Sequence, residues 1–346
     1  MTGLLLLLAV GLTLAIIAAV ALTEFLLTHP PRRTYATALA RSRPGDPSEL
    51  RGVFQIEGAS PVGEWPRAFD AFNITHRGVT IPVWRVKGDD PSGTIAILTH
   101  GWGDSRIGAL SRVAYVARHC RACVMWDMPG HGEATGGTRL GAYEAEFLAS
   151  VAREATADAP DGPDAGLMLM GWSLGAGVSL VAAAGELRDR VACVVIEAPY
   201  RRVRTPAANV LKMQGLPSGW TLNAALGVLG VFWGVGAKWR GFDRVEHAAK
   251  IGCPALVLHG DADEVCPLED ARAIAAAAGN ATLVVIPGGT HNGMWTDSKG
   301  LVHAVTALDA FVAGLRGAAA ADSSEKSDAP YHRPYASQPS QPEPHG

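Results

Sequence analysis

Short apolar runs alternate with amphipathic segments through the middle and C-terminal parts of this chain. The runs are rich in Val, Leu, Ile and Ala, which is typical of strands buried on both faces of a parallel sheet. Predicted strands cover residues 94–99, 122–127, 166–171, 191–196, 254–259 and 281–286, and predicted helices cover residues 108–119, 139–157, 175–187, 268–279 and 299–315. This alternation predicts an α/β fold, in which helices cover both faces of a mainly parallel sheet.

Two segments depart from the alternation. Residues 70–87 alternate in polarity around His76-Arg77-Gly78, which predicts an antiparallel hairpin. Residues 200–250 insert an apolar, Gly-rich and aromatic stretch between two predicted core strands. We expect this insertion to form one or two helices, and partial contact with a membrane is the alternative.

The same pattern divides the chain into four parts. Residues 1–27 are almost entirely apolar, and residues 28–69 are predicted to be a linker that becomes structured near Phe54. Residues 70–316 form the α/β domain. Residues 317–346 are rich in Ser, Pro and Ala, and we expect them to be disordered.

The N-terminal segment carries no charge from Thr2 to Thr23. About 22 residues at a rise of ~1.5 Å span roughly 33 Å, enough to cross a bilayer. We therefore predict a transmembrane helix that is retained as an anchor. A cleavable signal peptide ending near Ala19-Val20-Ala21 is the alternative, but no Lys or Arg precedes the apolar run, and the run is long for a signal peptide.

Basic residues follow this segment and none precedes it. Arg32, Arg33, Arg41 and Arg43 lie after the apolar run, so the positive-inside rule predicts that the domain lies on the cytoplasmic side. The five cysteines are scattered and odd in number, which favours a reducing compartment over a disulfide framework. The chain is therefore predicted to be a single-pass membrane protein with a cytoplasmic domain.

Composition excludes some function classes. Hydrophobic residues make up 48% of the chain, enough for a sizeable core, and the net charge of −3 offers no basic field for nucleic acid. The basic cluster of Arg201, Arg202 and Arg204 is either a solvated face or a site for a carboxylate or lipid phosphate. Cys120-Arg-Ala-Cys123 has redox-like spacing, but its context favours a structural role, and no Cys/His set has the spacing of metal ligands.

The pentapeptide Gly171-Trp172-Ser173-Leu174-Gly175 lies where a predicted strand passes into a predicted helix. A serine on so tight a turn projects its hydroxyl away from the backbone, and side chains in place of the two glycines would collide with a neighbouring strand or helix. Asp263 and His291 each follow a later predicted strand. The chain order Ser, Asp, His is the order used by α/β-hydrolases.

Taken together, these motifs resemble the α/β-hydrolase superfamily over roughly residues 70–316. The resemblance rests on the segments Leu98–Gly103, Trp126–Gly132, Gly171–Gly175, His259–Pro267 and Gly288–His291. It is strongest to the serine-hydrolase branch of esterases, lipases, thioesterases and serine aminopeptidases. The resemblance implies an α/β-hydrolase fold with a helical lid at about residues 200–250, whose helices we expect to line an acyl or aromatic pocket.

A catalytic triad follows from these positions. Ser173 is the predicted nucleophile, and His291 is the predicted base that takes its proton and returns it to the leaving group. Asp263, which matches the family's His-Gly-x-x-Asp spacing, is predicted to orient the imidazole. The alternatives are His259 and His303 for the base, and Asp261 and Glu264 for the acid.

The resemblance also implies an oxyanion hole. The backbone N–H groups of Trp102 and Leu174 are expected to stabilise the oxyanion. The turn from Asp127 to Gly132 is interpreted as structural. The mechanism requires no cofactor and no metal. Possible substrate-pocket residues are Trp172, Tyr200, Phe232 and Trp233.

The sequence therefore favours a membrane-anchored serine hydrolase of esters or thioesters, whose partner is a small-molecule or lipid-like acyl substrate. A serine aminopeptidase is one alternative, for which Glu197 is a candidate to capture the substrate amine. The favoured interpretation of Glu197 is a structural carboxylate bonded to loop N–H groups. An acyltransferase would use the same triad, and a non-catalytic binding protein of this fold is the remaining alternative.

Overall fold

The computed structural model describes residues 2–50 and 63–327. Within these residues, one eight-stranded sheet has the order β1-β2-β4-β3-β5-β6-β7-β8. Its strands are β1 Phe69–His76, β2 Val79–Lys87, β3 Thr94–Thr99, β4 Cys120–Trp126, β5 Leu167–Trp172, β6 Val191–Glu197, β7 Ala255–Gly260 and β8 Ala281–Ile286. The strands β1, β2 and β4 pair antiparallel, and every pair from β4 to β8 is parallel. The predicted α/β-hydrolase fold, with its hairpin at one edge of a mainly parallel sheet, is confirmed.

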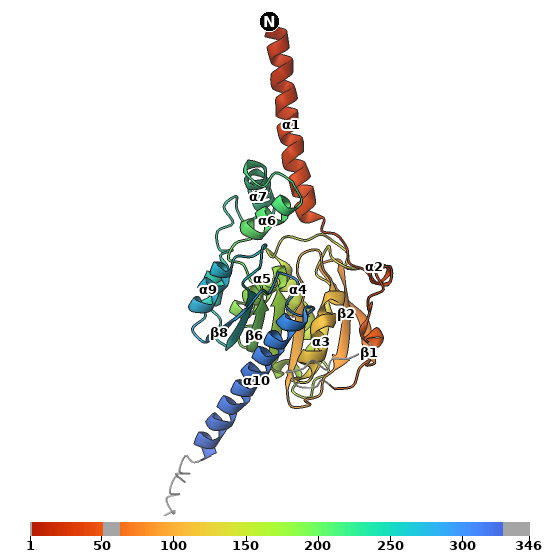
Figure 1. Cartoon of the computed structure of the whole chain (residues 1–346), viewed down its shortest axis with the longest axis vertical. Helices are drawn as coiled ribbons and strands as arrows, with labels where there is room; N and C mark the ends of the chain where they lie inside the picture. Colours follow the sequence, from red (N-terminus) through yellow and green to blue (C-terminus); the bar gives the residue numbers. More distant parts are fainter. Residues whose placement is uncertain (1, 51–62, 328–346) are drawn as a thin grey trace, which may run out of the picture.

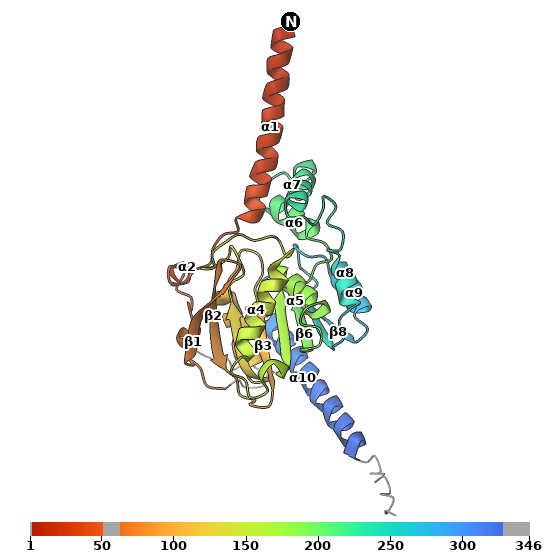
Figure 2. The same ribbon diagram turned by 180° about the vertical axis from the view of Figure 1, so that it is seen from behind.

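Helices cover both faces of the sheet. The helices of the domain are α3 Leu110–Ala117, α4 Glu144–Thr156, α5 Leu174–Ala184, α6 Arg204–Met213, α7 Trp220–Phe232, α8 Arg244–Ala248, α9 Leu268–Ala277 and α10 Ser298–Ser327. Side chains alternate along each strand, so Ile95 and Ile97 of β3 join the core beneath α4, α5 and α9. Ala96 and Leu98 join the core beneath α3 and α10. Figure 1 shows the α3 and α10 face, and Figure 2 shows the α4 and α5 face.

Helix α1, Thr2–Thr28, projects from the domain as a single long helix (Figure 1). Most of it is exposed, although its apolar side chains would ordinarily avoid water, and only its last turns contact the domain. There it lies beside α7 and buries Thr23 and Leu27. Of the described residues, Thr2–Thr28 and Lys299–Ala318 are long and apolar enough to cross a membrane. The second of these belongs to α10, which buries an apolar stripe against the sheet.

The insertion at residues 200–250, which we call the lid, forms α6, α7 and the short α8. Helices α6 and α7 lie on the domain beside the base of α1, as both views show (Figures 1 and 2). The outer face of α7 exposes Val228, Val231 and Phe232, the last with 84% of its surface accessible. The lid therefore adds exposed apolar surface at the base of the N-terminal helix.

The chain between α1 and the sheet is docked on the domain. It contains α2 Tyr35–Leu39 and the 3₁₀ turn Pro47–Glu49, and it buries Ala38 and Leu50 in the core beneath α3. Phe54, where structure was expected to begin, lies outside the described residues.

The C-terminal helix is longer than the pattern predicted. A disordered tail was expected from residue 317, but α10 continues to Ser327. The run of alanines after Gly317 explains the extension, because alanine has the highest helix propensity of all residues. Residues 328–346 of the expected tail lie outside the described residues.

Candidate active site

Ser173 occupies the turn between the central strand β5 and helix α5. Its backbone has φ 52° and ψ −116°, a strained conformation for a residue with a side chain. A conformation of this kind persists only where the surrounding structure enforces it. Here the buried β5 fixes the chain on one side and the buried α5 fixes it on the other.

The two flanking glycines make this turn possible. A Cβ at Gly175 would lie 2.0 Å from the carbonyl oxygen of Thr99, at the end of the neighbouring strand β3. A Cβ at Gly171 would lie 2.3 Å from the carbonyl oxygen of Gly175 itself. Any larger residue would therefore push apart the strand and helix that hold Ser173.

Three side chains from distant parts of the sequence meet at this turn. His291 Nε2 lies 3.1 Å from Ser173 Oγ, and His291 Nδ1 lies 2.8 Å and 3.0 Å from the carboxylate oxygens of Asp263. Asp263 follows β7, and His291 lies in the loop after β8. All three sequence-predicted triad positions thus form one hydrogen-bonded chain at the carboxyl ends of the parallel strands, where sites of this fold class form.

Asp263 is held as a carboxylate. Its side chain is only 1% exposed, and one of its oxygens also accepts the N–H groups of Val265 and Cys266, each at 2.8 Å. Burial alone would raise its pKa, but the hydrogen bond and charge of His291, with these two N–H groups, hold the pKa below its ordinary value of 3.8. A carboxylate in this state is suited to accept the Nδ1–H of the imidazole.

The alternative acids and bases lie elsewhere. Asp261 is exposed and accepts the N–H of Gly288 at 2.6 Å. Glu264 is exposed, and His303 contacts the carbonyl of Lys299 on its own helix. His259 is fully buried, and its Nε2 lies 3.0 Å from the carbonyl oxygen of Cys266 and 3.7 Å from Asp263. Burial lowers the pKa of His259, so it is a neutral packing partner behind the acid.

Two backbone N–H groups lie beside the serine. Leu174 begins α5, so its N–H is one of the first-turn amides that have no acceptor within the helix. The chain at Gly101 passes so close that a Cβ there would lie 3.3 Å from Ser173 Cβ. Trp102 follows Gly101, and its indole N–H donates to the carbonyl of Leu27 at 3.0 Å. The predicted oxyanion positions therefore flank Ser173.

A cavity of about 470 Å³ opens onto Ser173 and His291. Its walls are mainly apolar, and Trp172 and Tyr200 line it as expected. Helix α6 contributes Leu211 and its neighbours, and the last turns of α1 contribute Leu26 and Leu27. The α1 residues were not predicted, because nothing in the local pattern indicates that the end of the N-terminal helix lies against the site. We call this the acyl cavity, after the acyl pocket predicted from the sequence.

Two expected pocket residues lie elsewhere. Phe232 is 84% exposed on the outer face of α7, and Trp233 lines a different cavity. Neither lines the acyl cavity. Helix α7 is apolar on nearly all sides, so periodicity gave no indication of which face turns inward.

Sequence comparison agrees with this geometry. Residues 96–304 match the model of the alpha/beta hydrolase family, which is more than half of the chain. The chain belongs to the alpha/beta hydrolase family. No curated protein is similar enough in sequence to count as a match.

Solved structures show how far the hydrolase fold extends. An esterase of Pyrococcus furiosus shares 18% identity, with 72% of this chain and 98% of that chain covered and a TM-score of 0.55. An esterase of Rhodococcus sp. shares 19% identity, with 71% and 99% covered and a TM-score of 0.52. A membrane phospholipase A described as a bacterial virulence factor shares 16% identity, with 91% and 98% covered and a TM-score of 0.54. At these identities the likeness shows the fold alone.

Glu197 of this hydrolase is not free to capture an amine. It is fully buried, and both of its carboxylate oxygens accept from the guanidinium of Arg112 at 2.7 Å and 2.8 Å. The guanidinium in turn lies 4.0 Å from the centre of the Trp172 ring. The structural interpretation is correct, but the partner is a buried arginine from α3 rather than the loop N–H groups we expected.

Other polar residues singled out in the sequence have structural partners. Asp127 accepts the N–H groups of Arg106 and Glu133 and pairs with the Arg106 guanidinium, so the turn after β4 is tied to the domain. Arg201 and Arg202 both pair with Asp243. Cys120 and Cys123 are buried free thiols, 3.3 Å apart.

Among the described residues, Asp263, Cys266 and His291 are the one group of potential metal ligands close enough to share an ion. Burial, followed by the nearby carboxylates, raises the pKa of the Cys266 thiol well above its ordinary value. A neutral thiol is a poor metal ligand. Because the other two residues already bond to each other and to Ser173, the group is better explained by the hydrogen-bonded chain than by a metal.

Proposed function

We propose that this chain is a membrane-anchored serine hydrolase that cleaves carboxylic esters or thioesters of hydrophobic acyl groups. The observation that carries the proposal is the hydrogen-bonded chain from Ser173 through His291 to Asp263, at the floor of an apolar cavity. A free serine hydroxyl is a weak nucleophile, and an adjacent base oriented by a third group is what activates it. The EC 3.1.1 class of carboxylic ester hydrolases fits this arrangement best.

In the proposed mechanism, Ser173 Oγ attacks the acyl carbonyl while His291 Nε2 takes its proton. The N–H groups of Leu174 and Trp102 donate to the oxyanion. His291 then gives the proton to the departing alcohol or thiol, which leaves an acyl group on Ser173. A water molecule, deprotonated by His291, attacks this acyl-enzyme and releases the carboxylic acid. Asp263 holds the imidazole and stabilises its cationic form.

Substrate class is inferred from the walls of the acyl cavity. Leucine side chains of α1 and α6, together with Trp102 and Val203, offer contacts to an alkyl chain and few to a charged one. The buried pairing of Glu197 with Arg112 removes the candidate amine-binding carboxylate, which favours an ester over a peptide substrate. The walls therefore support a lipid-like acyl group.

Membrane anchoring is supported by features that lie together. Helix α1 is long and apolar enough to span a bilayer, and the exposed apolar face of α7 lies beside its base. The fold likeness to a membrane phospholipase A covers a larger share of this chain than the likeness to the esterases. The arginines that follow α1 favour a cytoplasmic domain.

A fluorophosphonate probe, which reacts with activated serines, tests the nucleophile. Wild type should be labelled and Ser173→Ala should not, while Ser92→Ala, an exposed serine on a loop before β3, should be labelled like wild type. Hydrolysis of p-nitrophenyl esters of increasing chain length then measures the size of the acyl cavity. Labelling of folded Ser173→Ala, or turnover close to wild type in that variant, would disprove the proposed nucleophile.

The anchor needs its own test. Membranes from cells that express the full chain should retain it after alkaline carbonate washing, because a spanning helix resists extraction. Recovery of the chain in the carbonate supernatant would rule out a retained anchor, whatever the labelling result.

A further inference from the structure

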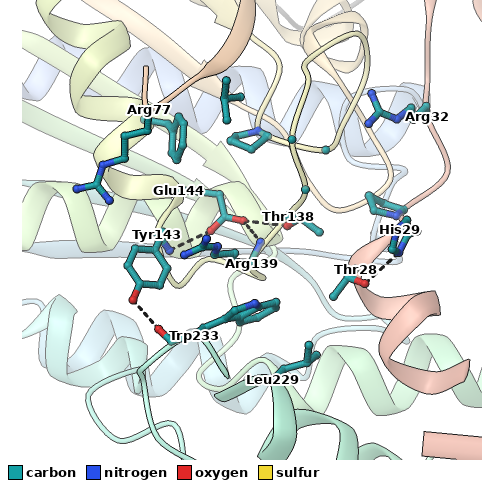
Figure 3. Close-up of a pocket in the computed structure, with 17 residues that line it drawn as sticks. Thr28, His29, Arg32, Arg77, Thr138, Arg139, Tyr143, Glu144, Leu229 and Trp233 are labelled. Atoms are coloured by element: carbon teal, nitrogen blue, oxygen red, sulfur yellow. Dashed lines mark hydrogen bonds between the residues drawn. The ribbon is translucent and has the colours of Figure 1, made fainter. Parts of the chain in front are cut away.

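A second cavity, of about 550 Å³, lies beside the end of α1 (Figure 3). It shares no lining residue with the acyl cavity. Its walls come from the chain just after α1, the β1–β2 turn, the loop at residues 129–139, the start of α4 and the end of α7. Its volume falls within the range of small-molecule sites. We call it the basic cavity.

Three arginines and one carboxylate line the basic cavity. Arg32, Arg77 and Arg139 supply the positive charges, and Glu144 supplies the negative charge. The carboxylate is buried, and its oxygens accept the Thr138 hydroxyl and three backbone N–H groups. Glu144 thus serves the fold of its own loop and forms no ion pair with these arginines among the described residues.

Two of the three arginines have no acidic partner in the described part of the chain. Arg139 is exposed, and its guanidinium lies over the Tyr143 ring, 4.7 Å from the ring centre. Arg32 donates from one terminal nitrogen to the carbonyls of Ala134 and Gly132. Arg77 pairs with Glu146 at 2.9 Å, in an exposed position at one end of the cavity. The cavity therefore presents guanidinium groups without a matching anion.

The basic cavity lies where the proposed anchor leaves the membrane. Thr28, the last residue of α1, and His29 both line it, and Trp233 and Tyr143 line its other side (Figure 3). The Tyr143 hydroxyl donates to the carbonyl of Trp233 at 2.6 Å, which ties the end of α7 to the domain. Aromatic and basic side chains at this level of a membrane protein are suited to the headgroup region.

We propose that the basic cavity binds the phosphate group of an anionic phospholipid headgroup. A planar guanidinium donates two parallel hydrogen bonds to phosphate, and this geometry is the reason that arginine dominates phosphate sites. The proposal rests on the anchoring part of the proposed function and does not depend on Ser173. In this arrangement the headgroup contacts α1 and α7 together.

Native mass spectrometry of the full chain in detergent tests the site. Ser173→Ala protein is titrated with phosphatidylglycerol or with phosphatidylcholine of the same acyl chains, so that hydrolysis does not consume the lipid. We expect phosphatidylglycerol to bind about tenfold more tightly, and Arg139→Gln, combined with Ser173→Ala, to lose most of this preference. Arg139→Lys should keep part of it, because the charge remains without the planar fork.

Arg272→Gln provides the matched control. It removes one exposed arginine from α9, a helix that contributes no residue to the basic cavity, and should leave the headgroup preference unchanged. Equal binding of the two lipids by the parent protein, or a preference that survives both Arg139→Gln and Arg32→Gln, would overturn the proposal. Fluorophosphonate labelling of the same arginine variants on the wild-type Ser173 background reports whether the domain remains folded.

A free phosphate is the other source of the same chemistry. Inorganic phosphate is therefore added as a competitor in the titration. Displacement of phosphatidylglycerol only at concentrations far above that of the lipid supports the lipid headgroup, whereas displacement at equal concentrations would overturn it in favour of a soluble anion. A chain that carbonate extracts from membranes would refute the anchor, and the phosphate competition would still report on the cavity.

Discussion

The two cavities beside the end of α1 are similar in volume but differ in the chemistry of their walls. The acyl cavity has mainly apolar walls and a nucleophile–base pair, whereas the basic cavity has guanidinium groups and no such pair among its lining residues. Leu26 and Leu27 line the first, and Thr28 and His29 line the second. Successive residues of a helix point about 100° apart, so one helix end can form part of two unlike surfaces. The contrast fits the two proposals, in which one cavity binds an acyl chain and the other binds a lipid headgroup at the same membrane surface.

Substitutions in the catalytic triad of the acyl cavity should have the largest effect. Asp263→Asn should lower kcat by roughly 10³- to 10⁴-fold, because the imidazole loses the carboxylate that fixes its tautomer. Asp261→Asn, two residues away and exposed, should change kcat by no more than a few-fold. Steady-state kinetics on a short p-nitrophenyl ester measure both. A larger loss in Asp261→Asn would move the acid to that residue.

Acidification should destabilise the walls of both cavities. His100 precedes Gly101 of the acyl cavity, His131 follows Gly130 of the basic cavity, and their rings lie 5.0 Å apart. Burial lowers the pKa of His100 to about 4 and, together with the charge of His100, lowers that of His131 to about 3.

The sign of this effect follows from proton binding. Between pH 6.5 and 4 the unfolded chain binds protons that the folded chain does not. Lowering the pH through this window should therefore reduce the free energy of unfolding by on the order of a few kcal/mol. Denaturant unfolding at several pH values measures this slope, and His131→Asn should flatten it. A stability that is constant across this window would contradict the buried neutral state of both histidines.

Deletion of α1 should separate the chemistry of the triad from the binding of long acyl chains. Deletion of residues 2–27 should release a soluble domain that still hydrolyses short esters, because the triad lies wholly in the domain. Hydrolysis of long-chain esters should fall by about tenfold, because Leu26 and Leu27 no longer line the acyl cavity. The ratio of kcat/KM for long and short esters is the measurement. An unchanged ratio would show that α1 takes no part in acyl binding.

The outer face of α7 should give the smallest effect. Phe232→Ser removes the most exposed large apolar side chain of the lid from a position outside both cavities. Turnover of a lipid ester in vesicles should fall several-fold, while turnover of a soluble ester should stay near the wild-type value. Equal effects on the two substrates would instead assign Phe232 a role in the fold.

The strands of the core could be predicted from the sequence almost to the residue. The predicted strand 94–99 is β3 itself, because a run buried on both faces has one strong pattern. The two glycines around Ser173 also made the turn predictable, since only glycine fits beside Thr99. Local patterns were sufficient wherever the structure is determined by local geometry and by contact with the sheet.

Contacts between distant segments could not be predicted in this way. Arg112 and Glu197 are 85 residues apart in sequence, and nothing near either residue identifies the other. The same holds for Leu27, which meets Trp102 across 75 residues. The inward face of α7 was also undetermined, because an almost wholly apolar helix has no polar face to mark the outside. Polar pairing and lid orientation depend on tertiary packing, which local periodicity does not encode.

If α1 spans the bilayer as proposed, its length sets the depth at which the active site lies. Its 27 residues extend about 40 Å, whereas the hydrocarbon of a bilayer is about 30 Å thick. In the proposed orientation the surplus holds the mouth of the acyl cavity at the level of the headgroups. One helical turn more or less would shift that mouth by about 5 Å along the membrane normal. Bilayer thickness would then control access to the serine, since a thicker membrane takes in more of the helix.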